Sequence, residues 1–427
     1  MRATAAFAGT AFYREFAMRQ VALSVSSLLA GMALFMLANG SLPTLLALRL
    51  ANAGEAAWVI GVVMAQYSLG IVIGTLYGHR LIMGVGHIRA FAVFGSTMSA
   101  VTLAHAFIVD PWVWGVFRFI VGACAVGMYM CVESWLNARA DNDNRGRILS
   151  LYVITVYFFQ GAGQFLIQLP DETGFVLYAL MSILMSLAIL PVAMTRMPAP
   201  ELPEQSRFDF VKLWRTSPTG MVVALFSGLI LGSFLGVGPV YAQYSGLDAG
   251  GTALFMSAVI IGGLILQWPI GRFSDGRDRR GFMLVINLAL AVLSIWLAVS
   301  GVSGYVLIAL AVLFGGLSGT LYPLSVAYTN DFLEAEDLVP AAGGLVMAYG
   351  MGAVFGPPLA AVSIEVLGAG GLFAFAGIVA IGASAVIVWR IRAAPGPRMA
   401  DQVDFQAMAR TSPVVGELDP RGETEDE

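Results

Sequence analysis

The chain has 427 residues, of which 58% are hydrophobic and only 12% are charged, and its formal net charge is −4. Soluble globular proteins usually carry charge on about a quarter of their residues, so this composition excludes an ordinary soluble protein. The slight acidic excess also excludes the strongly basic surface that a nucleic-acid-binding protein needs. The composition predicts a protein that crosses a lipid bilayer several times.

The apolar residues form twelve runs of about 20 residues, which is the length that a helix needs to cross the hydrocarbon core of a bilayer. The runs lack the alternating pattern, about ten residues long, of a membrane β-barrel strand. We therefore predict an all-α membrane protein with twelve transmembrane helices in two six-helix halves. The predicted spans are 21–48, 56–78, 90–109, 112–136, 148–168, 174–194, 219–243, 251–271, 282–300, 304–329, 340–364 and 370–391.

A polar stretch rich in proline and charged residues separates the first six predicted spans from the last six. We expect two helical bundles joined by a linker. The end of the chain contains proline, glycine and many acidic residues, a composition typical of disorder. The predicted parts are a cytoplasmic N-terminal segment at 1–20, a first bundle at 21–194, a cytoplasmic linker at 195–217, a second bundle at 218–392 and a disordered acidic cytoplasmic tail at 393–427.

A weak internal repeat favours duplication of one six-helix unit. Pro43 precedes an Ala-Gly pair at 53–54, and Pro239 precedes an Ala-Gly pair at 249–250 with the same spacing. A proline inside a transmembrane helix leaves backbone groups that neighbouring helices have to satisfy, and it bends the helix. The two prolines are therefore expected at equivalent places in the two halves.

The distribution of basic residues predicts the orientation. Lys and Arg in short loops concentrate on the cytoplasmic side of a membrane protein. With the N-terminus inside, the predicted cytoplasmic segments hold all but two of the 23 basic residues, and the exceptions are Arg49 and Arg118. Both termini are therefore predicted to be cytoplasmic.

The eighth predicted span ends at a dense run of charged residues that is incompatible with the hydrocarbon core, so this run is an aqueous loop. Gly271, Asp275, Arg279 and Arg280 have the spacing of the pattern Gly-x-x-x-Asp-x-x-Gly-Arg-Arg. In this loop the chain resembles the major facilitator superfamily, in which the motif follows transmembrane helices 2 and 8. Asp278 stands where the motif has glycine.

The run Gln-Trp-Pro-Ile-Gly-Arg at 267–272 is similar to a bacterial branch of that superfamily, the YcaD-like transporters. The resemblance implies a secondary transporter of the inner membrane with the major facilitator fold. Such a protein moves a small organic solute by alternating access, with or without protons. The implied partners are a small-molecule substrate and the lipid bilayer, and the implied state is a monomer.

Two ionisable residues lie deep in the predicted spans, and both belong to the fourth. Arg118 and Gly122 resemble the fourth-helix pattern Arg-x-x-x-Gly of the superfamily, which implies binding of an anionic substrate group or an influence on proton movement. Pairing with a polar neighbour is an equal alternative. Glu133, followed by Arg145 and Arg147, resembles the pattern that closes the fourth helix, and we favour a charge-relay gate over direct proton carriage. The predicted cytoplasmic gate consists of Glu133, Arg145, Arg147, Gly271, Asp275, Arg279 and Arg280.

Neutral polar side chains in several predicted spans mark a polar path through the bundle. Gln160 and Gln164 are four residues apart and share one helical face, which suits the hydroxyl or carbonyl groups of a solute. The predicted substrate pathway consists of Asn39, Gln66, Tyr67, Arg118, Tyr157, Gln160, Gln164, Tyr322 and Tyr349.

Other classes of protein have weaker support. The chain contains no His-Glu-x-x-His or Gly-x-Ser-x-Gly motif and only three histidines, so we predict no enzyme, no cofactor and no metal site. A transporter-like receptor or scaffold without net transport remains an alternative, and a multidrug/proton antiporter is a weaker one. The span-five antiport pattern Gly-Pro-x-x-Gly-Gly is absent.

Overall fold

The computed structural model describes residues 2–140, 144–194, 200, 210–334, 337–393, 402 and 404–418, without the side chains of 2–24, 210 and 417. These residues are almost entirely helical. The helices are α1 (Arg2–Asn52), α2 (Ala57–Val85), α3 (His87–Ala104), α4 (Pro111–Asn137), α5 (Arg145–Gly163), α6 (Val176–Leu187), α7 (Ile189–Met194), α8 (Phe210–Thr216), α9 (Pro218–Tyr244), α10 (Ala249–Arg272), α11 (Arg279–Ser300), α12 (Gly304–Asn330), α13 (Leu338–Leu367) and α14 (Gly371–Ala393), with short 3-10 helices η1 (Gln164–Gln168) and η4 (Pro413–Leu418).

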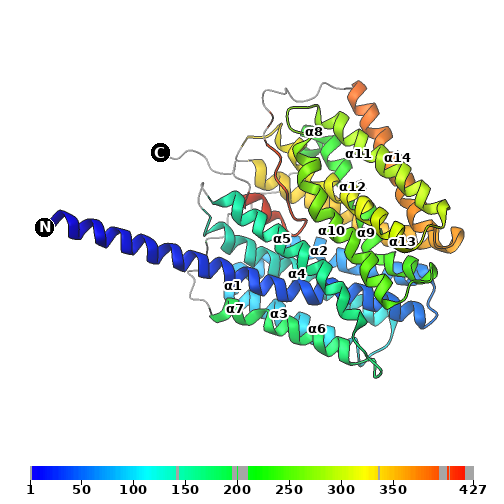
Figure 1. Cartoon of the computed structure of the whole chain (residues 1–427), viewed down its shortest axis with the longest axis horizontal. Helices are drawn as coiled ribbons and strands as arrows, with labels where there is room; N and C mark the ends of the chain where they lie inside the picture. Colours follow the sequence, from blue (N-terminus) through cyan, green and yellow to red (C-terminus); the bar gives the residue numbers. More distant parts are fainter. Residues whose placement is uncertain are drawn as a thin grey trace.

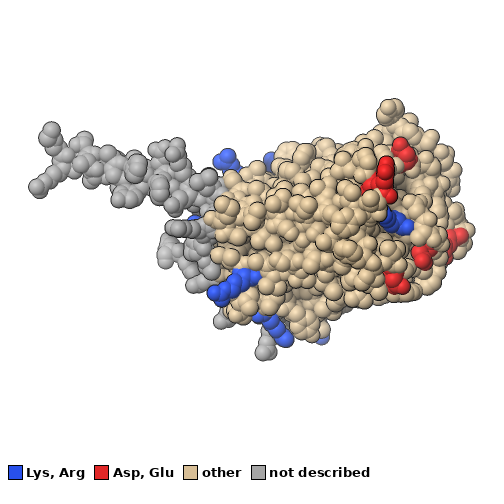
Figure 2. All heavy atoms as spheres, turned by 90° about the horizontal axis from the view of Figure 1, so that it is seen from below, with Lys and Arg blue, Asp and Glu red and all other residues tan. Residues whose placement is uncertain are grey.

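The long helices run roughly along one axis (Figure 1). We call the end of the bundle that holds the α2–α3 and α10–α11 turns the terminal end, because the C-terminal segment 404–418 lies there, and the other end the distal end. On the face seen in Figure 2, the visible Asp and Glu gather toward the distal end, and most of the visible Lys and Arg lie toward the terminal end.

Eleven helical stretches in the described part of the chain are long and apolar enough to cross a membrane. Two of them combine neighbouring elements, α5 with η1 and α6 with α7. The predicted span at 90–109 is the exception, because α3 has only 18 residues and begins with His87 and Arg89. Length and composition therefore support eleven spans, where the sequence predicted twelve, although α3 packs against α4 and α6 like its neighbours.

Glycines set the closest helix contacts. A Cβ on Gly122 of α4 would lie 2.0 Å from the carbonyl oxygen of Tyr67 in α2, and a Cβ on Gly228 of α9 would lie 2.0 Å from the carbonyl oxygen of Tyr349 in α13. Small residues let transmembrane helices approach closely where the hydrophobic effect gives no drive for association. Both contacts hold a tyrosine of the predicted pathway in place.

The internal repeat is only partly visible in the structure. Pro43 lies inside α1 and Pro239 inside α9, so the two prolines occupy matching helices. The glycines do not match: Gly54 forms the α1–α2 turn with a positive φ of 83°, whereas Gly250 lies inside α10. Gly246, with φ 78°, makes the turn after α9. The two Ala-Gly pairs therefore lie near corresponding junctions, but their glycines have different backbone conformations.

The two groups of helices meet at the distal end. Gln243 at the end of α9 donates from Nε2 to Oδ1 of Asn52 at the end of α1, at 2.7 Å. The backbone N–H of Trp58 at the start of α2 donates to Oε1 of Glu365 near the end of α13, at 3.0 Å. These bonds join the α1–α7 group to the α9–α14 group where the helices end.

The C-terminal segment differs most from its prediction. Residues 404–418 were expected to be disordered, but they occupy a defined position between the two groups of helices, drawn in red in Figure 1. Their buried side chains include Phe405, Met408, Thr411, Ser412, Val415 and Leu418. The acidic residues that suggested disorder cluster after this segment, and residues 419–427 lie outside the described part.

The predicted linker at 195–217 is described only at its end. There α8 precedes α9, and Lys212 of α8 contacts Asp337, just before α13, with Nζ 2.6 Å from Oδ1. Residues 195–199 and 201–209 lie outside the described residues, as does the acidic C-terminus. The predicted N-terminal segment at 1–20 has helical backbone from residue 2 within α1, without described side chains.

Candidate functional site

A cavity of about 170 Å³ lies in the middle of the bundle, between the two groups of helices. Helices of both groups contribute to its wall, among them α1, α2, α4 and α5 on one side and α9, α10 and α13 on the other. Seven residues of the predicted pathway line this cavity: Asn39, Tyr67, Arg118, Tyr157, Gln160, Gln164 and Tyr349.

Arg118 provides the positive charge of the cavity wall contributed by α4. Its side chain is almost fully buried, and its guanidinium carbon lies 4.5 Å from the centre of the Tyr67 ring. Nε and Nη1 of Arg118 have no hydrogen-bond partner among the described residues. A buried guanidinium with open donors is a site for an anionic or strongly accepting group.

Asn39 fixes the edge of the Tyr67 ring. Its Nδ2 donates to the hydroxyl of Tyr67 at 3.0 Å, while its Oδ1 has no partner among the described residues. Asn39 of α1, Tyr67 of α2 and Arg118 of α4 therefore form one polar wall from three helices of the first half.

The Gln164 side chain forms two hydrogen bonds to α1. Its Nε2 donates to the carbonyl oxygen of Gly40 at 2.6 Å, and its Oε1 accepts from Thr44 Oγ1 at 2.7 Å. Both contacts tie η1 to α1, and they use one N–H and one lone pair of the amide. Gln160, one turn earlier on α5, also lines the cavity and is not part of this pair of bonds.

Two predicted pathway residues lie elsewhere. Gln66 precedes Tyr67 by one position, so it points to another face of α2; its Nε2 donates to Val62 O at 3.3 Å and it packs beside Gly115 of α4. Tyr322 is buried behind Tyr349, with their ring centres 5.4 Å apart in an edge-to-face arrangement. Tyr322 supports the cavity wall without lining it.

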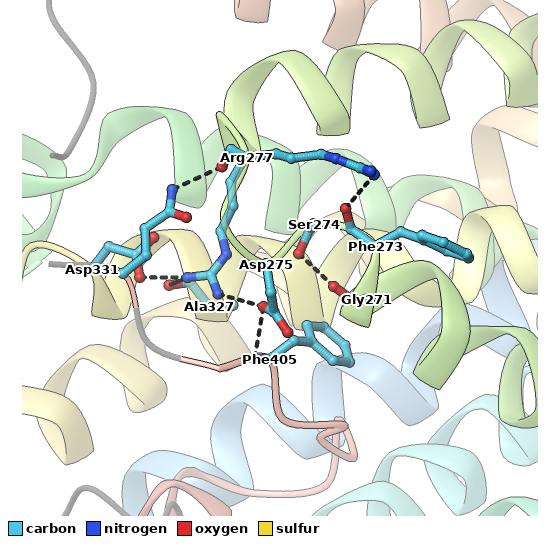
Figure 3. Close-up of polar contacts among 10 residues, drawn as sticks. Gly271, Phe273, Ser274, Asp275, Arg277, Ala327, Asp331 and Phe405 are labelled. Carbon is cyan, nitrogen blue, oxygen red and sulfur yellow. Dashed lines mark hydrogen bonds and ion pairs between the residues drawn. The ribbon is translucent and has the colours of Figure 1, made fainter. Parts of the chain in front are cut away.

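The α10–α11 turn carries the predicted loop motif (Figure 3). Gly276 makes the turn with a positive φ of 66°. The turn glycine of this chain therefore lies two positions before Asp278, which occupies the glycine position of the motif. Asp278 instead caps α11, because its side chain accepts from the backbone N–H of Arg280 at 3.1 Å. Arg280 also lies 3.6 Å from Asp278 through its Nε.

Arg279 is the centre of this turn. Its Nη2 donates to Oδ1 of Asp275 at 3.1 Å, and its Nη1 donates to the carbonyl oxygen of Ala327 at 3.1 Å and to the carboxylate of Asp331. The side chains of Arg279 and Asp331 are both fully buried. The network locks the turn to the end of α12, as Figure 3 shows.

Asp331 was not among the predicted gate residues. It follows α12 directly, and it lies 52 positions after Arg279 in the chain, so no local spacing pairs the two. The sequence did carry one hint of this role, because Asp331 is an acidic residue just after the predicted span 304–329. Gly271, by contrast, was predicted for its motif and packs against the ring of Phe405.

Glu133 lies at the terminal end of α4 and is fully buried. Its carboxylate accepts a hydrogen bond from the hydroxyl of Tyr152 at 2.6 Å and further bonds from the hydroxyls of Thr411 and Ser412. Of the two arginines predicted to form a gate with Glu133, Arg145 is buried and Arg147 is exposed.

The sequence and the fold are similar to those of known transporters. The profile of the Major Facilitator Superfamily matches residues 23–302 and 220–415. An uncharacterized MFS-type transporter of Enterobacter sp. (strain 638) is 30% identical over 342 residues, which cover 79% of this chain and 88% of the relative. The uncharacterized MFS-type transporter YcaD of Salmonella arizonae is 29% identical over 355 residues, covering 80% and 89% of the two chains.

Among solved structures, a mutant of the nucleoside transporter NupG superposes with a TM-score of 0.73 at 12% identity, covering 86% of this chain and 99% of that one. A bacterial homologue of the human lysosomal transporter Spinster, in an inward-facing and occupied conformation, gives a TM-score of 0.67 at 10% identity, covering 89% and 98%. At these identities the similarity concerns the fold alone.

Proposed function

The chain belongs to the major facilitator superfamily, and we propose that it is a secondary transporter that moves a small organic solute across the bacterial inner membrane by alternating access. The family consists of transporters and not of enzymes, as the sequence predicted. The observation that carries the proposal is the central cavity, because both halves line it and polar side chains face it. Binding between two halves near the membrane midplane is the arrangement that alternating access requires.

The charge distribution supports an orientation with the terminal end in the cytoplasm. Basic residues cluster at that end, in the α2–α3 and α10–α11 turns, whereas acidic residues such as Asp110, Asp171, Asp248 and Glu365 lie at the distal end. Lys and Arg mark the cytoplasmic side of bacterial membrane proteins. The distal hydrogen bonds between the halves then close the cavity toward the periplasm.

We propose that Arg118 binds an anionic group of the solute. Its guanidinium is buried and stacked on Tyr67, with two donors that have no partner among the described residues. A carboxylate or phosphate would satisfy both donors with charge-assisted hydrogen bonds. The methionine and leucine side chains of the cavity, Met36, Met64, Met256, Leu231 and Leu235, suit an apolar body attached to that group.

The direct test is ligand-dependent thermal stability of the purified full-length protein against a library of organic acids, sugar phosphates, amino acids and cationic drugs. A compound present at about a hundred times its dissociation constant stabilises the folded state by roughly 2.7 kcal/mol. The expected hit is anionic, and its stabilisation is lost in Arg118→Gln and kept in Arg147→Gln, whose arginine is exposed at the start of α5.

Transport of the hit into proteoliposomes completes the test. Uptake that Arg118→Gln abolishes supports the transporter. Binding without uptake in either direction favours the receptor alternative, and binding of cations alone favours the multidrug antiporter. Proton coupling is tested in the same vesicles with Glu133→Gln: if Glu133 carries the proton, pH-driven uptake stops while solute exchange continues, and if it acts in the gate, both slow together.

A further inference from the structure

The C-terminal segment 404–418 occupies the terminal mouth of the cavity that we propose as the solute pathway. It starts beside the α10–α11 turn, passes the ends of α4 and α5, and ends in η4 against α13. Thr411 and Arg410 belong to the cavity wall. The segment therefore stands where a solute would leave toward the terminal end.

The first anchor of the segment lies on the second half. The backbone N–H of Phe405 donates to Oδ1 of Asp275 at 3.0 Å, next to the ion pair with Arg279 (Figure 3). The Phe405 ring fills the space over Gly271, where a Cβ would lie 2.2 Å from Cδ1 of the ring. Gln267 of α10 donates to the carbonyl oxygen of Met408 at 3.4 Å.

The second anchor lies on the first half. The hydroxyls of Thr411 and Ser412 both donate to the buried carboxylate of Glu133. A buried acceptor that loses its donors is costly, and more so when it is charged. The segment thus bridges the two halves that alternating access has to move against each other.

Between the anchors, Arg410 reaches into the cavity. Its Nε donates to the hydroxyl of Tyr157 at 3.1 Å, and its Nη2 donates to the same oxygen. Its guanidinium carbon lies 5.4 Å from the centre of the Tyr157 ring and 5.5 Å from that of Tyr349. Tyr157 comes from α5 and Tyr349 from α13, so one ring belongs to each half.

We infer that Tyr157 and Tyr349 form a subsite for a cationic group, and that the chain occupies it with Arg410 as a tethered stopper that keeps the terminal mouth shut. Two aromatic faces and a phenol oxygen are the groups that bind a guanidinium or ammonium in a desolvated place. This subsite faces the same cavity as Arg118, so the inference rests on the proposed function and extends it to solutes that carry a cation as well as an anion.

The rate at which a reagent enters the cavity tests the stopper directly. Cys124 and Cys131 are replaced by alanine in the full-length chain, and Leu235, which lines the cavity, is replaced by cysteine. The labelling rate of Leu235→Cys by a water-soluble maleimide is then followed in detergent. We expect slow labelling with the native segment and a rate at least about tenfold higher with Arg410→Gln, the factor expected when a desolvated cation–π contact is lost.

The matched control is Arg392→Gln, which removes the same charge from an exposed position in the last turn of α14 and should leave the rate unchanged. The double variant Thr411→Val, Ser412→Ala releases the segment from Glu133 and should also accelerate labelling, which keeps the test valid if Arg410→Gln fails to fold. Equal rates in native, Arg410→Gln and double-variant proteins overturn the stopper.

Methylguanidinium probes the subsite itself, with methylurea as a neutral molecule of nearly the same shape. In the native-tail protein, methylguanidinium should compete with Arg410 and accelerate labelling in a concentration-dependent way, and methylurea should not. The same effect from both compounds overturns the cationic subsite.

The labelling rates need no transported solute, so the two proposals fail separately. If labelling behaves as expected but no solute is carried, the proposed transporter is wrong. If a solute is carried at the same rate with native and Arg410→Gln chains and labelling does not change, the stopper is wrong.

Discussion

Glu133 illustrates how a single carboxylate depends on neighbours from distant parts of the chain. It is fully buried, and its described hydrogen bonds come from Tyr152 on the next helix and from two hydroxyls near the C-terminus. A buried carboxyl group is costly unless its oxygens have such hydrogen-bond donors. Removing one donor therefore measures how much the hydrogen bonds to Glu133 contribute to the stability of the protein.

The substitution Tyr152→Phe deletes only the phenol oxygen that donates to Glu133 at 2.6 Å. We expect it to destabilise the protein by about 1–3 kcal/mol, because a buried acceptor loses a partner. The apparent melting temperature of the purified protein checks this. The loss should shrink in a Glu133→Gln background, where no buried charge remains.

Tyr178→Phe is the matched control, because Tyr178 is equally buried but its hydroxyl has no hydrogen-bond partner among the described residues. Its melting temperature should stay the same or rise. An equal loss in both variants would show that the phenol oxygen of Tyr152 does not act through Glu133.

At the same scale, the sequence predicted which residues face the cavity better than it predicted what they do there. Polar side chains in lipid-spanning helices turn toward the interior, so most of the predicted pathway lines one cavity. Gln164 shows the limit: it lines the cavity, and its two bonds also tie η1 to α1, which no spacing reveals. Arg410 lay in a stretch that composition assigned to disorder.

Among the elements, α2 and α4 show how glycine positions the cavity wall. Gly122 of α4 meets the carbonyl oxygen of Tyr67, and Gly70 of α2 meets that of Phe119, each with no room for a Cβ. The rings and charges on these two helices, Tyr67 and Arg118, are therefore placed by a backbone contact.

Gly122→Ala would place a Cβ 2.0 Å from the backbone oxygen of Tyr67, so α2 and α4 have to move apart. We expect a loss of about 1–3 kcal/mol, the usual range for overpacking, together with weaker binding of any ligand that contacts Arg118. Thermal melting with and without the ligand measures both effects.

Gly84→Ala, near the terminal end of the same α2, provides the control, because a Cβ there meets nothing within 4 Å. Alanine should even stabilise this helix by roughly 0.5–1 kcal/mol relative to glycine. If Gly122→Ala melts like Gly84→Ala, the two helices are not held by this contact.

Element by element, the apolar runs predicted every long helix, since span length and hydropathy are local properties. Two elements differ from this pattern. The helix α3 is shorter than the runs around it, and the segment 404–418 combines Phe405, Met408, Val415 and Leu418 with hydroxyls between stretches of polar residues. The average composition of the whole tail is polar, so it did not reveal these apolar residues. Their position is determined by contacts with the helical bundle, which the sequence does not show.

For the whole molecule, the sequence predicted an all-α fold of two six-helix halves, and the fold is confirmed by the similarity to solved transporters; the cytoplasmic position of both termini stays a prediction. The sequence did not predict the contacts that close the distal end of the cavity. These contacts join residues far apart in the chain, such as Asn52 with Gln243 and Trp58 with Glu365, and no motif marks these pairs.

Alternating access requires the distal contacts to break in each transport cycle. Asn52 and Gln243 join the two halves by a side-chain hydrogen bond of 2.7 Å, so cysteines at these positions lie within reach of a short bifunctional thiol reagent. In the background without Cys124 and Cys131, cross-linking of Asn52→Cys with Gln243→Cys should stop solute uptake in proportion to the linked fraction. Reduction of the link should restore uptake.

The two single-cysteine variants treated with the same reagent are the controls, and both should transport as before treatment. Ligand binding from the terminal end should survive cross-linking in the Arg410→Gln chain, in which the stopper is released, because the cavity itself is unchanged and only the distal end is fixed. Full uptake by the cross-linked protein would contradict this prediction. The solute would then cross without separation of Asn52 and Gln243, so the two halves would not need to move apart at the distal end during transport.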